Sequence, residues 1–152
     1  MTDYEEQSAV LHTLRVLLKS HQAILNALKR DMRTYGLSEN EFMLLEFLYH
    51  RGPKAIQIIK GHLGIPDSSL TYVIDGLSEK GLVKRKRCDK DRRKIYINLE
   101  SAGRQLMDEI FPKHKAFVEN LFSVLSKKEL MQIDQLNKSL GFHAEALLRE
   151  ER

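Results

Sequence analysis

The hydrophobic pattern of this chain changes its period at residue 82, and that change limits the folds open to it. Residues 95–99, Ile-Tyr-Ile-Asn-Leu, alternate in polarity so that every second side chain faces the same way. This is the period of a half-buried β-strand. Residues 82–87 also fit a strand, and the segment between the two is mostly charged. We therefore expect a β-hairpin with a charged tip at residues 88–94.

On both sides of this hairpin, apolar residues recur every three to four positions, which is typical of helices. Ser38 with Glu41, and Ser126 with Glu129, have the spacing of capping boxes that begin helices. Pro112 lies inside the segment after the hairpin and predicts a kink there. The expected helices span residues 4–33, 38–51, 55–63, 67–80, 106–125 and 126–147. The predicted fold class is mainly α with one small β-hairpin.

The first predicted helix carries two adjacent apolar stripes. One of them repeats every seven residues and consists of Leu11, Leu18, Leu25 and Met32. Together the stripes make a face that is wider than a surface helix of a single domain needs. The last predicted helix is amphipathic as well. The sequence leaves open whether these faces pack within one chain or against a second copy.

The positive charge is concentrated in the predicted hairpin. The chain has 152 residues, with 25 Lys and Arg against 21 Asp and Glu, yet residues 84–94 alone carry eight basic and two acidic side chains. The rest of the chain is therefore slightly acidic. Such a local field on a nearly neutral body favours a polyanionic partner. A solvated loop would have the same composition, so charge alone does not decide.

Several classes of protein are disfavoured. One cysteine cannot form an intramolecular disulfide, and no apolar run approaches the roughly 20 residues of a membrane helix. The first residues do not resemble a secretory signal, so we expect a cytoplasmic location and no membrane partner. The histidines lack the spacing of metal ligands, and no nucleophile or phosphate-loop motif is present. We expect no metal, no cofactor and no enzymatic activity.

Residues 38–99 are expected to run as helix, short helix, tight turn, helix and hairpin. The turn contains Gly64 and Pro66, and two helices joined in this way form a helix-turn-helix. The second helix opens with the polar side chains Ser68, Ser69, Thr71 and Tyr72. In that motif the start of the second helix meets base edges in the major groove. A basic hairpin beside it reaches the neighbouring backbone or minor groove, so the two features together predict nucleic-acid binding.

Short motifs across residues 36–103 occur in a characteristic order. The most specific is Gly81-Leu82-Val83 followed ten residues later by Asp91-Arg92-Arg93; the others include Gly36-Leu37-Ser38, Leu63-Gly64-Ile65 and Val73-Ile74-Asp75-Gly76-Leu77. They resemble the multiple-antibiotic-resistance regulator (MarR) family of winged-helix transcription factors. The resemblance implies a winged helix-turn-helix at residues 37–99 and a helical dimerisation region from residues 1–36 and 100–152. It also implies a homodimer that binds a pseudo-palindromic DNA duplex.

The resemblance also implies roles for individual residues. Arg93 resembles the wing arginine that enters the minor groove, whereas Asp75 and Asp91 resemble acids that position the wing. Because a strand alternates its faces, we expect about two of the four basic residues at 84–87 to reach DNA. The residues expected to bind DNA are Ser68, Ser69, Thr71, Tyr72, Lys84, Arg85, Arg87, Lys90, Arg92 and Arg93.

Members of this family are typically switched by a small phenolic or other anionic aromatic effector, or by cysteine oxidation. The candidates for an effector crevice are His12, Arg15, His21, Phe42, Phe47 and Tyr49. Each of them has a plain alternative role in the core or on the surface. Cys88 is the redox candidate because neighbouring cations favour its reactive thiolate. The alternative is an incidental surface thiol.

We expect a homodimeric repressor that binds double-stranded DNA sequence-specifically and is released by an aromatic effector or by thiol modification. The rival hypothesis is a winged-helix adaptor that docks an acidic protein partner. The polar start of the second helix argues against the rival, because protein interfaces more often use apolar anchors.

Overall fold

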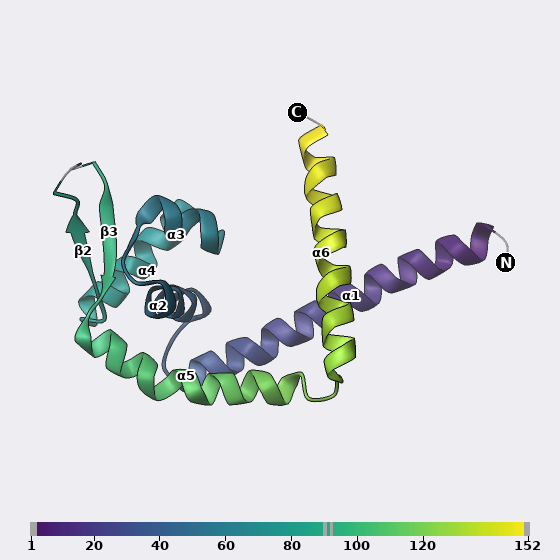
Figure 1. Cartoon of the computed structure of the whole chain (residues 1–152), viewed down its shortest axis with the longest axis horizontal. Helices are drawn as coiled ribbons and strands as arrows, with labels where there is room; N and C mark the ends of the chain where they lie inside the picture. Colours follow the sequence, from purple (N-terminus) through teal and green to yellow (C-terminus); the bar gives the residue numbers. More distant parts are fainter. Residues whose placement is uncertain (1–2, 90, 92, 151–152) are drawn as a thin grey trace. The chain divides into compact units, whose positions relative to one another are not determined.

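The computed structural model describes residues 3–89, 91 and 93–150 (Figure 1). In this part of the chain the elements run in the order α1 (Asp3–Thr34), α2 (Glu39–Arg51), β1 (Lys54–Ala55), α3 (Ile56–Leu63), α4 (Asp67–Glu79), β2 (Val83–Arg87), β3 (Ile95–Leu99), α5 (Ser101–Leu121) and α6 (Lys127–Glu150). The prediction of a mainly α fold with a small β-hairpin is confirmed. The chain divides into two compact units, Met1–Lys115 and Ala116–Arg152.

Both predicted capping boxes are present. The Ser38 hydroxyl accepts the Glu41 N–H at 3.3 Å, and the Glu41 carboxylate accepts the Ser38 N–H at 2.8 Å. Ser126 and Glu129 make the same reciprocal pair at the start of α6. These bonds satisfy donors that the first turn of a helix leaves without a helical partner, so the local sequence determines where α2 and α6 begin.

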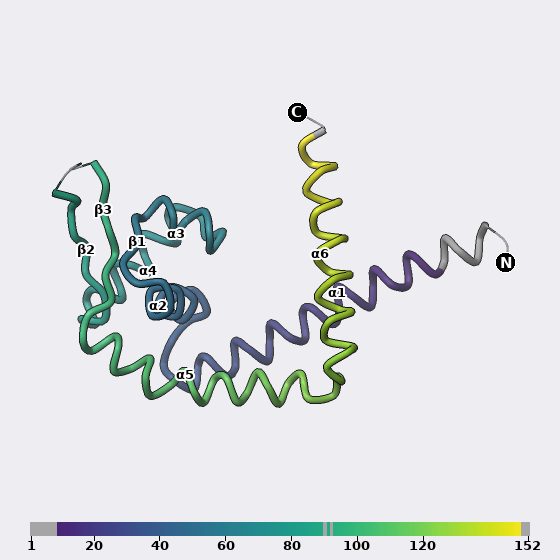
Figure 2. Tube along the Cα trace, in the orientation of Figure 1, coloured from purple at the N-terminus to yellow at the C-terminus, as the bar shows by residue number. Residues whose placement is uncertain are grey.

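The hairpin belongs to a three-stranded antiparallel sheet with the strand order β1-β3-β2. Val83 lies opposite Leu99, and Arg87 lies opposite Ile95. The strand β1, which can be followed in Figure 2, was not expected, because two residues are too few for a period to show. The strand β2 also begins one residue later than expected. The reason is that Leu82 closes the end of α4 by donating its N–H to the Leu77 carbonyl at 2.9 Å.

The core lies where α2 packs against α4 and β3. Phe42, Leu45, Ile74, Leu77 and Ile97 are each at most 1% exposed. Burying a large apolar side chain contributes roughly 1.5–3 kcal/mol relative to leaving it in water. This core fixes α4 and the hairpin in relation to each other, and thereby positions the site described below.

The helix α5 begins directly after β3 and packs closely on the base of the hairpin. A Cβ built on Gly103 would lie 2.2 Å from the Leu82 carbonyl oxygen and 2.8 Å from a methyl carbon of Leu99. The same Leu82 oxygen accepts the Glu100 N–H at 2.9 Å. A glycine at position 103 therefore allows the helix to touch the backbone of the hairpin.

The ends of α5 differ from the prediction of residues 106–125. It begins at Ser101 and ends at Leu121, where a turn closed by the Ser123 N–H on the Asn120 carbonyl separates it from α6. It continues through Pro112, and the kink expected there stays a prediction. Among the described residues, no helix is long and apolar enough to cross a membrane.

Candidate nucleic-acid interface

The helix α4 presents a polar face beside the hairpin. Gly64 ends α3 with a φ of 63°, a left-handed conformation that glycine adopts without strain, and Pro66 precedes the first turn of α4. Leu70, Val73, Ile74 and Leu77 bury the opposite side of the helix. Ser68, Thr71 and Tyr72 remain exposed, and 80% of Tyr72 is accessible to solvent. Ser69 is half-buried.

The basic residues of β2 fall into two groups. Lys84 lies 2.6 Å from Glu100, and the Arg85 guanidinium lies 2.6 Å from the Asp75 carboxylate on α4. The resemblance implies that Asp75 positions the wing, and its ion pair with Arg85 links α4 to β2. Lys86 and Arg87 are exposed. Which of these strand residues contact DNA stays a prediction.

The tip of the hairpin is organised around Asp91. Its side chain accepts the Arg93 N–H at 3.1 Å, and its carbonyl accepts the Lys94 N–H at 2.9 Å. This leaves the Arg93 side chain 96% exposed and 3.6 Å from the Asp91 carboxylate. Lys90 and Arg92, which are also expected to bind DNA, lie outside the described residues.

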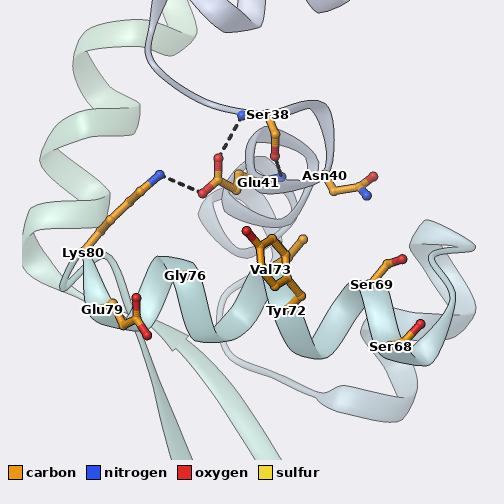
Figure 3. A pocket seen from close by; sticks show the side chains of 10 residues that line it. All are labelled: Ser38, Asn40, Glu41, Ser68, Ser69, Tyr72, Val73, Gly76, Glu79 and Lys80. Carbon is orange, nitrogen blue, oxygen red and sulfur yellow. Dashed lines mark hydrogen bonds and ion pairs between the residues drawn. The ribbon is translucent and has the colours of Figure 1, made fainter.

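A groove of about 760 Å³ runs between the start of α2 and the exposed face of α4 (Figure 3). It brings together three of the residues expected to bind DNA, Ser68, Ser69 and Tyr72, with residues that were not expected to bind DNA, among them Ser38, Asn40, Glu41, Glu79 and Lys80. Lys80 reaches across the groove to the Glu41 carboxylate at 2.7 Å. No local pattern identifies this pair, because its members are 39 residues apart.

Comparison with known proteins agrees with this geometry. The MarR family model matches residues 37–95. The HTH-type transcriptional regulator YkoM of Bacillus subtilis is 34% identical over 144 residues, which cover 95% of this chain and 94% of YkoM. MhqR of the same organism, also an HTH-type transcriptional regulator, is 33% identical over 129 residues, covering 85% and 89%. The chain belongs to the MarR family.

The solved structure of AbsC, a MarR family transcriptional regulator from Streptomyces coelicolor, superposes with a TM-score of 0.75 at 25% identity, over 96% of this chain and 97% of AbsC. As a MarR family member, this chain is a DNA-binding transcriptional regulator rather than an enzyme. The family assignment supports a DNA-binding regulator over the rival hypothesis of an adaptor that docks an acidic protein.

The six effector candidates of this MarR protein have different surroundings. His12, Arg15 and His21 are exposed on α1. Phe42 is fully buried, with its ring centroid 4.4 Å from that of His114, so it serves the core and is not free to line an open crevice. Phe47 stacks on His62 at 4.5 Å beside a pocket of about 440 Å³.

Tyr49, the remaining candidate, lies in a polar contact between α2 and α5. It donates its hydroxyl to Asp108 at 2.6 Å, and the Arg104 guanidinium lies 5.5 Å from the centre of its ring. The hydrogen bond to Asp108, followed by burial and the Asp108 charge, raises the pKa of Tyr49. The phenol is therefore neutral at ordinary pH and acts as a hydrogen-bond donor.

A buried polar cluster that the sequence did not reveal joins α1 to α5. The Asp31 carboxylate lies 2.7 Å from His114 Nδ1 and accepts the Tyr35 hydroxyl at 3.1 Å. Burial, and then the hydrogen bond to Asp31, raise the pKa of Tyr35. The histidine is 83 positions from its partner, so only the fold brings them together.

Cys88 is a partly buried free thiol at the end of β2, and its N–H donates to the Lys94 carbonyl at 2.9 Å. Its role as a sensor stays a prediction. Among the described residues, no three His, Cys, Asp or Glu side chains are grouped so as to hold a metal ion.

Proposed function

We propose that this regulator is a homodimeric repressor that recognises a pseudo-palindromic duplex. The observation that carries the proposal is the exposed polar start of α4 next to a hairpin with exposed Arg87 and Arg93. In a winged helix-turn-helix, α4 enters the major groove and arginines of the wing reach the backbone or the minor groove. Ser68, Ser69, Thr71 and Tyr72 read base edges, and Tyr72 contributes most because it is the largest of the four side chains and is 80% exposed.

The wing supplies most of the affinity through neutralisation of phosphates. We assign this role to Arg87 and Arg93, together with Lys90 and Arg92. Lys84 and Arg85 contribute less, because Glu100 and Asp75 already neutralise them. Asp75 and Asp91 act by holding Arg85 and the tip of the wing in place.

Homodimerisation is supported by apolar side chains that the chain leaves exposed. On α1 these are Val10, Leu11, Leu14, Val16 and Leu18; on α6 they include Leu136, Leu140, Phe142 and Leu148. So many exposed large apolar residues mark an interface. A second copy that covers residues 1–36 and 100–152 removes them from water.

The oligomeric state tests this part of the proposal. Multi-angle light scattering is expected to give twice the chain mass for the wild type. Leu136→Asp, at a residue that is 68% exposed in the single chain, is expected to shift the mass toward the monomer. Gln135→Asp introduces the same charge at an adjacent polar position and is expected to stay dimeric. A monomeric wild type would refute the dimer.

Repression is supported by two relatives that are both 26% identical to this chain, the transcriptional repressor MprA of Escherichia coli and the transcriptional repressor MdtR of Bacillus subtilis. Selection of duplexes from a random library at roughly physiological salt tests the DNA specificity. An inverted repeat with half-sites about one helical turn, or 10 base pairs, apart is expected. Absence of any enriched sequence would refute sequence-specific binding by this dimer.

Variants of the wing and of α4 separate affinity from specificity. Arg93→Ala is expected to weaken binding to all duplexes and to lower the slope of log affinity against log salt by about one. Lys138→Ala is the control, because it removes an equal charge on α6, away from the proposed DNA interface. Tyr72→Ala is expected to change the preferred sequence more than the salt slope. If binding survives both changes at the interface, our site assignment is wrong.

Release by an aromatic effector is supported by the pocket beside Phe47. The pocket combines the ring stack of Phe47 and His62 with one cation, Arg51, and one carboxylate, Glu46. The rings suit a small aromatic molecule, and Arg51 is the group that an acidic substituent on it would pair with. Among proteins of the same fold, NadR has been solved with 4-hydroxyphenylacetate, and DNA binding by BpsR of Bordetella bronchiseptica is regulated by 6-hydroxynicotinic acid. Titration of 4-hydroxyphenylacetate into the protein–duplex complex tests the class. Release in the wild type that is weakened in Phe47→Ala is the expected result.

Thiol modification is the alternative trigger, and AbfR, which shares the fold, has been solved in an overoxidised form bound to DNA. Oxidation of Cys88 adds bulk or charge to the wing and is expected to weaken binding. Peroxide treatment of the wild type and of Cys88→Ser tests the thiol trigger: the wild type is expected to lose affinity and the variant is expected to keep it. Equal affinity of treated and untreated wild type would exclude the thiol.

A further inference from the structure

The start of α2 and the end of α4 are joined by a single carboxylate. Glu41 Oε2 accepts the Ser38 N–H at 2.8 Å, and Glu41 Oε1 accepts a hydrogen bond from Lys80 at 2.7 Å (Figure 3). The Glu41 side chain is only 15% exposed, so this ion pair is better shielded from solvent than an ordinary surface pair. Glu41, which completes the capping box of α2, therefore also binds Lys80 at the end of α4.

The Glu41 carboxylate is ionised, as the ion pair with Lys80 requires. Burial by itself would raise the pKa of Glu41, but the hydrogen bonds from Lys80 and from the Ser38 backbone, together with the Lys80 charge, outweigh burial and lower the pKa. The group is therefore ionised at neutral pH. A Cβ built on Gly76 would lie 3.9 Å from Glu41 Oε1, an ordinary van der Waals distance, so α4 is close to the carboxylate at this point as well.

The remaining contact between the two helices is apolar. Phe42 and Leu45 of α2 and Val73 and Leu77 of α4 are buried in the same core. Apolar burial is not directional, so it permits small rotations of a helix, whereas a hydrogen-bonded charge pair fixes an orientation. The Glu41–Lys80 pair provides the directional contact at the end of α4.

Small rotations matter because the reading residues lie at the opposite end of the helix. Lys80 and Ser68 are twelve residues apart, which is about 18 Å along a helix at 1.5 Å per residue. A tilt of about 5° at the Lys80 end therefore moves Ser68 by about 1.5 Å over that length. A displacement of this size exceeds the narrow distance range of hydrogen bonds to base edges.

We propose that Glu41 is a positioning residue for DNA recognition: through Lys80 it sets the orientation of α4, and with it the register of Ser68, Thr71 and Tyr72 on the bases. The inference rests on the proposed DNA-reading role of α4. This role differs from that of the residues that touch DNA, because Glu41 affects the sequence specificity of binding and not the positive charge that binds DNA.

The test is the ratio of affinities for the duplex selected by the wild type and for a scrambled duplex of equal length. Glu41→Gln is expected to lower this ratio about tenfold, which corresponds to about 1.4 kcal/mol. Glu39→Gln is the matched control: it makes the same change of charge one position from the N-cap, but Glu39 pairs with Lys29 of α1 at 3.1 Å and not with α4. Its ratio is expected to match that of the wild type.

Variants of Lys80 keep the test decisive if Glu41→Gln folds poorly. Lys80→Met leaves the capping box intact and is expected to lower the ratio as Glu41→Gln does, whereas Lys80→Arg preserves the pair and keeps the ratio near that of the wild type. The double variant is expected to be no worse than either single one. Circular dichroism at the assay temperature ensures that only folded variants are compared.

Two failures are distinguishable. A wild type with no preference for any duplex refutes the proposed function. A wild-type preference that persists in both Glu41→Gln and Lys80→Met, or that falls equally in Glu39→Gln, refutes the positioning role of Glu41 and leaves the proposed function standing.

Discussion

Replacement of Gly103 by alanine sets two opposing effects against each other. Gly103 lies in the first turns of α5, and in a helix alanine is more favourable than glycine by about 1 kcal/mol. Propensity alone therefore predicts that Gly103→Ala stabilises the protein. The tertiary structure predicts the opposite, because the new methyl group would lie 2.2 Å from the Leu82 carbonyl oxygen.

The magnitude follows from this distance. Ordinary contacts of a Cβ begin at 3.4 Å, so helix and hairpin must separate by about 1.2 Å. Overpacking of this kind costs about 1–3 kcal/mol. The separation also stretches the hydrogen bond from the Glu100 N–H to the Leu82 carbonyl, now 2.9 Å, whose loss costs about 1 kcal/mol. After subtraction of the propensity gain, we expect a net destabilisation of about 1–3 kcal/mol.

Urea denaturation at a fixed protein concentration measures the effect, because the midpoint and slope give the free energy of unfolding. Gly61→Ala is the control: it lies within α3, and a Cβ built there meets nothing within 4 Å, so it is expected to stabilise slightly. DNA affinity of Gly103→Ala is expected to fall as well, since the hairpin carries the wing. A Gly103→Ala protein as stable as Gly61→Ala would refute the close approach of α5 to the hairpin.

Three further outcomes are expected. Asp75→Asn removes the partner of Arg85 and is expected to lower DNA affinity several-fold in a fluorescence anisotropy titration, while the free energy of unfolding changes by less than about 1 kcal/mol, because the pair is exposed. Asp31→Ala leaves His114 buried without its partner and is expected to cost about 2–3 kcal/mol in urea denaturation; an unchanged midpoint would contradict this. Because the pKa of Glu41 is lowered in the folded protein, its ionised form contributes its full stabilisation above the usual glutamate pKa of about 4.3 and loses it as pH falls through the lower folded pKa. The free energy of unfolding is therefore expected to fall less between neutral and acidic pH in Glu41→Gln than in the wild type.

Much of the fold could be predicted from local pattern. The hairpin followed from an alternating segment at residues 95–99, and both capping boxes followed from two residues three positions apart. Hydrogen bonds within a strand pair or a helix turn depend on neighbouring residues, so the sequence specifies them directly. The two-residue strand β1 was not predicted, because it is too short to show a period and forms by pairing with β3. The ends of α5 were predicted wrongly, because the apolar residues that indicated this helix start only at Leu106 and continue past its end to Leu125.

The candidate site was likewise predicted in part from the sequence. The exposed residues of α4 and the basic hairpin were evident from the sequence, because polarity and charge are properties of single side chains. The sequence did not show which basic side chains are paired with carboxylates. Lys84 lies 2.6 Å from Glu100 and Arg85 lies 2.6 Å from Asp75, whereas Arg93 lies 3.6 Å from Asp91.

The sequence by itself thus determined the order of the helices and the hairpin, the place of the positive charge and the MarR resemblance. Only the tertiary structure decided the pairs Glu41–Lys80 and Asp31–His114, and the need for glycine at position 103. The physical reason is that these contacts join residues brought within a few ångströms by packing of the core. Their chemistry is short-ranged, and their partners are set by the fold and not by spacing along the chain.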